Sequence, residues 1–150
     1  MKDIINSNEM PNTGEIALYQ PDDTIRLEVM VEDETVWLTQ AQMAELFQTS
    51  IPNVNMHVKN IFTEGELEEN SVIKKILITA TDGKNYRTNH YNLDVIISVG
   101  YRVKSLRGTA FRRWATKTLK QYILKDFVIN QRIERVENFS IEIERHGIRC

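Results

Sequence analysis

The side chains best suited to chemistry form two groups, of which the first is polar. Its members are Gln40, Thr49, Ser50, Asn53, Asn55 and Lys59. An asparagine amide can bond both N6 and N7 of adenine, serine accommodates several base edges, and lysine reaches guanine or phosphate. Along the outer side of a short helix, these residue types predict contacts with base edges in the major groove of DNA.

The second group is basic. Residues 95–125 contain eight Lys or Arg and no Asp or Glu, and aromatic residues are interleaved among them. On a helix, Arg113, Lys117 and Lys120 share one face, as a row of phosphate contacts requires. The candidate phosphate ligands are Arg102, Lys104, Arg107, Arg112, Arg113, Lys117 and Lys120, with Lys84 and Arg87 from an earlier segment. The alternative is a solvated basic face that balances an acidic first half.

Charge is divided unevenly along the chain. Residues 1–70 hold 14 acidic and 3 basic residues, a net charge of −11, whereas residues 71–150 hold 7 acidic and 16 basic residues, a net charge of +9. The two add to the −2 of the whole chain. This asymmetry predicts that one surface faces a polyanion, although attraction between the two halves is a simpler alternative.

The elements that must position these side chains begin with strands. The 150 residues suffice for one domain, and residues 1–15, rich in Asn, Pro and Gly, predict a flexible arm. Alternating apolar residues predict a β-hairpin over 25–38 that turns at 32–34. A second hairpin is predicted over 72–92, where Asp82-Gly83 favours a type I′ turn. It would present Lys84 and Arg87 as the wing of a winged helix.

The rest of the chain is predominantly helical in pattern. Thr39 is the predicted N-cap of a first helix, and Pro52 suits the first turn of a second helix that ends before Gly65. Another helix follows from Leu93, and Thr109 is the predicted cap of a long helix after a break. A weak heptad-like pattern over 126–150 predicts a helical tail, through which a homodimer is one option.

Residues 38–62 resemble the helix-turn-helix of many bacterial regulators. Ala44 is small where the two helices would cross, and the connection over 48–50 is short. Gln48 departs from the pattern, because glycine is usual at this left-handed position. A left-handed glutamine costs about 1 kcal/mol, which a slightly different turn would avoid. The alternative is an ordinary helical hairpin that has no role in DNA binding.

Enzyme classes find little support. The chain contains no HExxH, GxSxG, Walker A or GxGxxG motif. His90 is expected in the core, and a metal site of His90 with Asp82 or Asp94 is a minor alternative. The single cysteine, Cys150, excludes an internal disulfide and favours a reducing cytoplasm. With no membrane-spanning apolar run and no signal peptide, we expect a cytoplasmic protein that is not an enzyme and uses no metal or cofactor.

Several ordered blocks carry a family resemblance. VWLTQ (36–40), MAELF (43–47), KNIFTEGEL (59–67), ATDGKNYRTNHYNLD (80–94), VGYRVKS (99–105) and FRRWAT (111–116) resemble the RhuM family of bacterial virulence-associated proteins over residues 16–125. The last block is also similar to the Bro-N domain of antirepressors. The resemblance implies DNA association and an origin on a mobile element or pathogenicity island. Family members are generally longer, so the segment after Phe127 is expected to be truncated or replaced.

These observations predict an α+β fold, with a winged helix-turn-helix-like unit, two β-hairpins and C-terminal helices. The expected divisions are an arm (1–15), a DNA-binding domain (16–125) and a helical tail (126–150). The predicted function is sequence-specific binding of double-stranded DNA, as a transcriptional regulator or accessory factor. The alternative is a protein-interaction module of antirepressor or antitoxin type that does not bind DNA.

Overall fold

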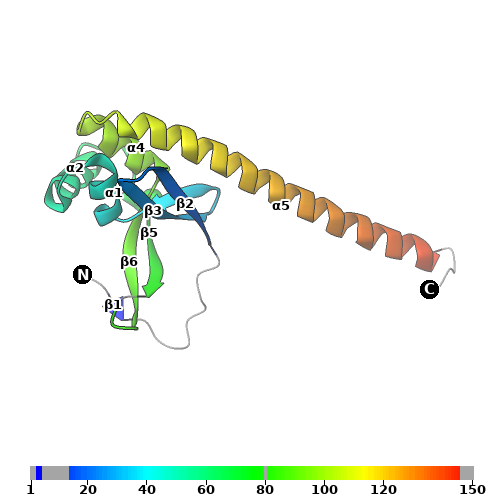
Figure 1. Ribbon diagram of the computed structural model, residues 1–150. Coiled ribbons are helices and arrows are strands. Elements are labelled where there is room, and N and C mark those ends of the chain that lie inside the picture. The colour runs from blue at the N-terminus through cyan, green and yellow to red at the C-terminus, as the bar shows by residue number, and fades with distance from the viewer. Residues whose placement is uncertain (1–2, 5–13, 80, 146–150) are drawn as a thin grey trace.

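One antiparallel sheet and the helices packed on it make up the computed structural model, which describes residues 3–4, 14–79 and 81–145 (Figure 1). The elements in chain order are β1 (Asp3–Ile4), β2 (Glu15–Asp22), β3 (Ile25–Glu32), β4 (Thr35–Leu38), α1 (Gln40–Phe47), α2 (Ile51–Thr63), α3 (Glu69–Val72), β5 (Ile73–Thr79), β6 (Asn85–Asn92), α4 (Leu93–Arg102) and α5 (Arg107–Arg145). This arrangement confirms the prediction of a mixed fold with antiparallel hairpins and C-terminal helices.

Strand β6 connects the two parts of the sheet. Strand β5 pairs along one edge of β6, while β4 and β1 share the other edge. Strand β4 pairs with β6 at Tyr91 and Asn92, and β1 pairs with it at Tyr86 and Arg87. Strands β3 and β2 follow outward from β4. Hairpin β5–β6 is therefore joined directly to the strand that precedes α1.

The predicted alternation in β3 is confirmed, and it fixes which face of the sheet bears the core. Ile25, Leu27 and Val29 are buried, whereas Arg26 and Glu28 between them are exposed. Strand β2 is an additional strand that pairs with β3. The hairpin predicted over 25–38 is thus part of a three-stranded meander.

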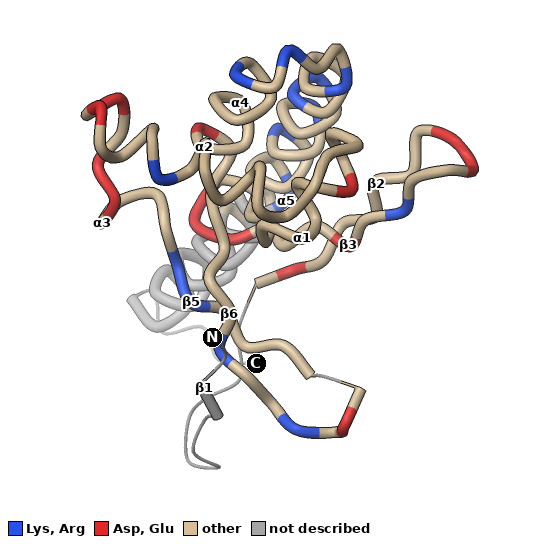
Figure 2. The backbone as a smooth tube through the Cα atoms, turned by 90° about the vertical axis from the view of Figure 1, so that its left-hand side faces the viewer, with Lys and Arg blue, Asp and Glu red and all other residues tan. Residues whose placement is uncertain are grey.

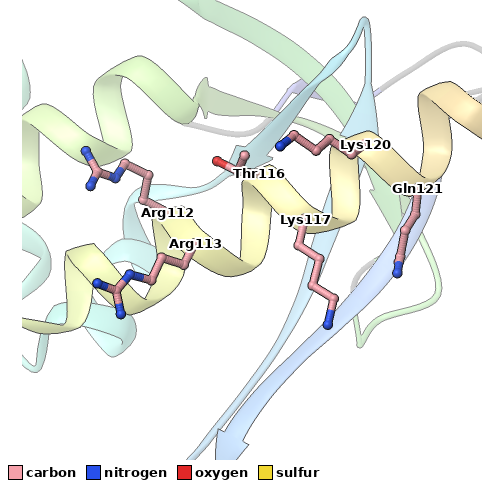
Figure 3. Close-up of a pocket in the computed structure, with 6 residues that line it drawn as sticks. All are labelled: Arg112, Arg113, Thr116, Lys117, Lys120 and Gln121. Atoms are coloured by element: carbon pink, nitrogen blue, oxygen red, sulfur yellow. The ribbon is translucent and has the colours of Figure 1, made fainter.

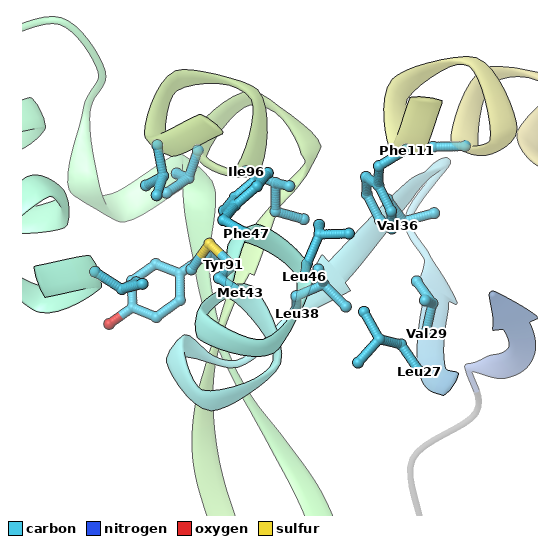
Figure 4. Packing of buried hydrophobic residues seen from close by; sticks show 14 of the residues in the cluster. Leu27, Val29, Val36, Leu38, Met43, Leu46, Phe47, Tyr91, Ile96 and Phe111 are labelled. Carbon is cyan, nitrogen blue, oxygen red and sulfur yellow. The ribbon is translucent and has the colours of Figure 1, made fainter. Parts of the chain in front are cut away.

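Helices α1, α4 and the first turns of α5 bury their apolar sides together (Figure 4). Helices α4 and α5 approach each other closely beside Phe47 of α1. A Cβ atom on Gly100 would lie 2.9 Å from Cε1 and Cζ of Phe47, and a Cβ on Gly108 would lie 3.7 Å from the Gly100 Cα. Two glycines therefore allow the helices to approach closely over one aromatic ring.

The type I′ turn lies in a different hairpin from the one predicted. The prediction of a type I′ turn at Asp82-Gly83 is wrong, because of these two residues only Gly83 has a positive φ (80°). Instead, Asp33 (φ 54°) and Glu34 (φ 61°) connect β3 to β4, with Glu32 paired to Thr35. Positive φ at both central residues is the requirement of a type I′ turn, here met without glycine.

The start of α5 also differs from the prediction. The helix begins at Arg107, whose N–H donates to Ser105 Oγ at 3.2 Å, so Thr109 is not its cap. It then runs without a break to Arg145, across the boundary predicted at residue 126. Within the predicted arm, Asp3–Ile4 forms strand β1, and residues 5–13 lie outside the described residues.

Candidate nucleic-acid interface

The corner between α1 and α2 is built by local hydrogen bonds that the sequence specifies. Thr39 and Gln42 form a reciprocal capping box at the start of α1. Ser50 caps α2, because its Oγ accepts the N–H of Asn53 at 3.2 Å. Between them Gln48 adopts the left-handed conformation (φ 55°, ψ 49°) in which a glycine is usual. The turn therefore has the left-handed first residue that is usual in helix-turn-helix corners, and Gln48 carries the steric cost that a different turn would have avoided.

Replacing Gln48 with glycine is expected to stabilise the protein by about 0.5–1 kcal/mol. Glycine removes the clash of a Cβ atom in the left-handed region, although the bond from Gln48 Nε2 to the Glu45 carbonyl is lost. Chemical denaturation measures the change, with Gln48→Ala as the control, since it loses the bond and retains the Cβ. Equal stability of the two variants would contradict a steric cost at this residue.

Helix α2 presents a continuous outer face. Its inner side buries Val54, Val58 and Ile61. On the opposite side, Met56, Lys59 and Asn60 are exposed. Met56 and Asn60 were not among the predicted site residues, although their helical spacing from the buried positions identifies them. The outer face thus offers one cationic and one amide side chain beside an apolar one.

The predicted base-contacting asparagines lie on the flanks of this face and are already oriented. Asn53 is half-buried, and its Nδ2 donates to Thr49 Oγ1 at 2.8 Å. Asn55 accepts from Gln40 Nε2 at 3.1 Å, and the same nitrogen donates to the Tyr91 hydroxyl at 3.0 Å. Gln40 and Thr49 therefore act as positioning residues. The bonds of Gln40 tie α1 and α2 to the end of strand β6.

Hairpin β5–β6 carries its basic residues unevenly. Lys84 is exposed in the connection between the strands, and Arg87 is half-buried on β6. Lys74 is engaged elsewhere, because its Nζ lies 3.0 Å from Glu32 Oε2 and 2.7 Å from Asp33 Oδ2. The hairpin tip therefore offers Lys84 to a ligand, while Lys74 attaches the hairpin to the β3–β4 turn.

The basic residues of α5 form an exposed surface, which we call the α5 basic face. It consists of Arg112, Arg113, Lys117 and Lys120 and, with Thr116 and Gln121, lines a shallow pocket (Figure 3). All four cations are exposed, and none has an acidic partner within the described part of the chain. The other side of the helix is held by Phe111 and Trp114, which pack on Tyr19 of β2. The helix thus has the basic exterior and anchored interior expected of a phosphate-binding element.

The three basic residues before this face have different surroundings. Arg102 donates from Nη2 to Glu64 at 2.7 Å and to Glu66 at 3.2 Å. The hydrogen bond from Arg102 lowers the pKa of Glu64 below its ordinary value. Lys104 is exposed and Arg107, the first residue of α5, is half-buried. We therefore leave Arg102 out of the candidate interface, because its guanidinium attaches α4 to the segment that follows α2.

Basic and acidic residues gather in different parts of the fold (Figure 2). In that view, Lys and Arg gather around the α4–α5 connection and the first turns of α5, and others lie along hairpin β5–β6, with α2 between them. Asp and Glu gather at the α2–α3 connection and at the β2–β3 turn. The ion pairs of Lys74 with Glu32 and Asp33, and of Arg102 with Glu64 and Glu66, join the acidic first half to the basic second half, so attraction between the halves accounts for part of the charge asymmetry.

Two other properties of the described residues bear on function, namely the capacity to hold a metal ion and the capacity to span a membrane. They contain no group of three or more His, Cys, Asp or Glu side chains placed to hold a metal ion. His90 is buried, and its Nδ1 lies 2.8 Å from the Thr88 carbonyl oxygen, to which the neutral ring donates. Within the same part of the chain, no helix is both long enough and apolar enough to span a membrane.

The buried His90 predicts a loss of stability in mild acid. Burial lowers the pKa of this ring below its ordinary 6.5, although the bond to Thr88 acts in the opposite direction. The unfolded chain therefore binds a proton near pH 6.5 that the folded chain does not. Stability should be constant above this pH and fall below it, by at most about 1.4 kcal/mol per pH unit, until the folded pKa is reached.

Denaturant unfolding between pH 7.5 and about 5.5 measures this slope for the native chain, for His90→Gln and for the control His57→Gln. The slope should disappear in His90→Gln and persist in His57→Gln. If His90→Gln retains the slope, another group causes it.

Comparison with known proteins gives one family. The model of the virulence protein RhuM family matches residues 71–145, which is half of the chain. The match begins and ends later than the resemblance over 16–125 predicted, and it includes the segment after Phe127 that was expected to be truncated or replaced. No curated protein and no solved structure matches the chain. The likeness to Bro-N domains stays a prediction.

Proposed function

Because the chain belongs to the virulence protein RhuM family, we propose a function for a member of that family: binding of double-stranded DNA through a winged helix-turn-helix-like unit. Helix α2 is the proposed recognition helix, hairpin β5–β6 the wing, and the α5 basic face a further phosphate-binding surface. The protein would act as a transcriptional regulator or an accessory factor, and not as an enzyme.

The order and pairing of the elements support the winged helix. A strand (β4), two helices joined by a tight corner (α1 and α2) and a hairpin (β5–β6) follow one another, interrupted only by the four-residue α3. The first strand pairs with the last strand of the hairpin, at Trp37 with Asn92 and Leu38 with Tyr91. This pairing joins the hairpin to the strand that leads into the helix pair, which supports the assignment of the hairpin as a wing.

The observation that carries the proposal is the exposed outer face of α2. A polar outer face is ordinary for a surface helix, so the feature that favours recognition is the pair of oriented amides on the flanks of this face. Here Asn53 and Asn55 are held by Thr49 and Gln40, and Lys59 is exposed one turn later. Amide groups held in place before binding lose little conformational entropy when they contact base edges.

Titration of DNA binding with salt tests the function. Fluorescence anisotropy with a labelled random-sequence duplex, at several salt concentrations between about 50 and 200 mM, gives the dependence of affinity on salt. Each phosphate contact should contribute about −0.9 to the slope of log K against log salt. With Lys59, Lys84 and the α5 basic face engaged, we expect a slope between about −4 and −6.

The same titration separates the proposal from a protein-interaction module. A labelled polyglutamate chain serves as the control, because it offers negative charge without the spacing of duplex phosphates. Binding of duplex in preference to polyglutamate supports the DNA interface. Absence of duplex binding at about 50 mM salt would refute it and favour a module whose basic helix contacts an acidic protein.

A further inference from the structure

Helix α5 is much longer than the body on which it packs. Its 39 residues correspond to about 58 Å at 1.5 Å per residue. Among the described side chains of α5, Tyr122 is the last that packs on the core, and the helix continues away from the sheet (Figure 1). Residues 123–145, which we call the distal segment, thus extend beyond the body, which they still contact near their start, where Lys125 Nζ lies 4.0 Å from Glu15 Oε1 of β2.

The distal segment has little intrinsic tendency to remain helical alone. Most helical stability in proteins comes from packing of an apolar face, and without such packing a helix depends on the propensities of its residues. The sequence of the segment is also rich in β-branched residues, including Val128, Ile129, Ile133, Val136 and Ile143, which lower helix propensity. A stable helix here therefore requires a packing partner.

The surface for that partner lies at the start of the distal segment. Ile123 is 48% exposed, Leu124 62%, Phe127 56% and Val128 42%. Positions 123 and 127, and likewise 124 and 128, are separated by four residues, so the four side chains form one patch over two helical turns. We call it the α5 apolar patch. Contiguous exposed apolar side chains of this kind mark an interaction surface.

We propose that a second copy of this chain covers the α5 apolar patch, so that the protein is a homodimer in which two α5 helices pack against each other. The charge of the distal segment favours this occupant. Residues 123–145 hold five acidic and four basic residues, a net charge of −1, so repulsion between two copies is weak and charges of both signs are present for pairing. The chain as a whole separates charges of −11 and +9, and a surface of either sign would oppose contact with its own copy.

The proposal differs from the tail contact predicted from the heptad-like pattern. That prediction used residues 128–145, most of whose side chains lie outside the described residues, whereas the α5 apolar patch at 123–128 consists of described side chains. It is also independent of DNA binding, because it concerns the chain without a ligand. The test of the homodimer can therefore fail while DNA binding is confirmed, and DNA binding can fail while the homodimer is confirmed.

Light scattering on the full chain without DNA tests the inference. The chain has a mass of 17.5 kDa, and we expect twice that value at micromolar concentration. In Leu124→Glu/Phe127→Glu, each patch would bring two carboxylates against two others, so the mass should fall to that of one chain. The far-ultraviolet helical signal should fall as well, because the distal segment loses its packing partner.

The matched control is Ile16→Glu/Leu18→Glu, the same change at two exposed residues of β2. This variant should keep the mass of two chains. Near-ultraviolet circular dichroism of Trp37 and Trp114 shows that the body of each variant is folded, and Leu124→Ser/Phe127→Ser replaces the patch variant if it is not. A native chain with the mass of one, three or four chains would overturn the proposal. So would a control that dissociates while the patch variant remains paired.

Discussion

A Phe111→Ala variant is expected to lose about 3–5 kcal/mol of the free energy of unfolding. The Phe111 side chain is completely buried where α5 crosses the sheet. Its ring lies edge-on to Tyr19, with 5.1 Å between centroids, and 5.6 Å from the ring of Trp114. Alanine would remove these contacts and leave a cavity, because the flanking rings belong to different elements and cannot close together freely.

Urea denaturation followed by tryptophan fluorescence measures the loss, since Trp114 adjoins the substituted ring. The control is Tyr101→Ala, because Tyr101 is 86% exposed and its removal should change stability by less than about 0.5 kcal/mol. If the two variants unfold at the same urea concentration, Phe111 does not anchor α5. That outcome would also weaken the DNA-binding proposal, because the α5 basic face depends on this anchor for its position.

The parts of the fold that follow from the sequence are those that neighbouring residues determine. The alternation from Ile25 to Val31 specifies the buried face of β3, since strand side chains alternate between faces. Thr39 specifies where α1 begins, because the group it caps lies within three residues. Ser50 was predicted only as a DNA contact, but its hydroxyl caps α2 in the same local way. The position of the corner at 48–50 likewise follows from the spacing of the two helices, whereas the sequence left open whether Gln48 is left-handed.

The parts that the sequence did not reveal depend on partners far along the chain. Arg102 belongs to an acid-free stretch, which favoured phosphate binding, but its ion partners Glu64 and Glu66 lie more than 35 residues away. Gln40 bonds Tyr91 across 51 residues, so its positioning role has no local signal. Pairings of this kind are specified by the register of the sheet, which no short window of sequence contains.

The α5 basic face gives the second large expected effect. In Arg113→Gln/Lys117→Gln, two cations without acidic partners among the described residues are neutralised. Each lost phosphate contact should reduce the magnitude of the salt slope by about 0.9, hence by about 1.8 for the pair. At about 0.1 M salt the affinity for duplex DNA should fall on the order of 50-fold, equally for every sequence, because phosphate contacts carry no base information.

Net charge alone could produce part of such an effect, and Arg26→Glu separates the two causes. This single substitution changes the net charge by two, as the double variant does, but at an exposed residue of β3. A general attraction between the protein and DNA would lower the affinity of both variants alike. Contacts at the α5 basic face would lower it mainly in Arg113→Gln/Lys117→Gln. If only Arg26→Glu weakens binding, the basic side of α5 faces away from the DNA, and the interface reduces to α2 and hairpin β5–β6.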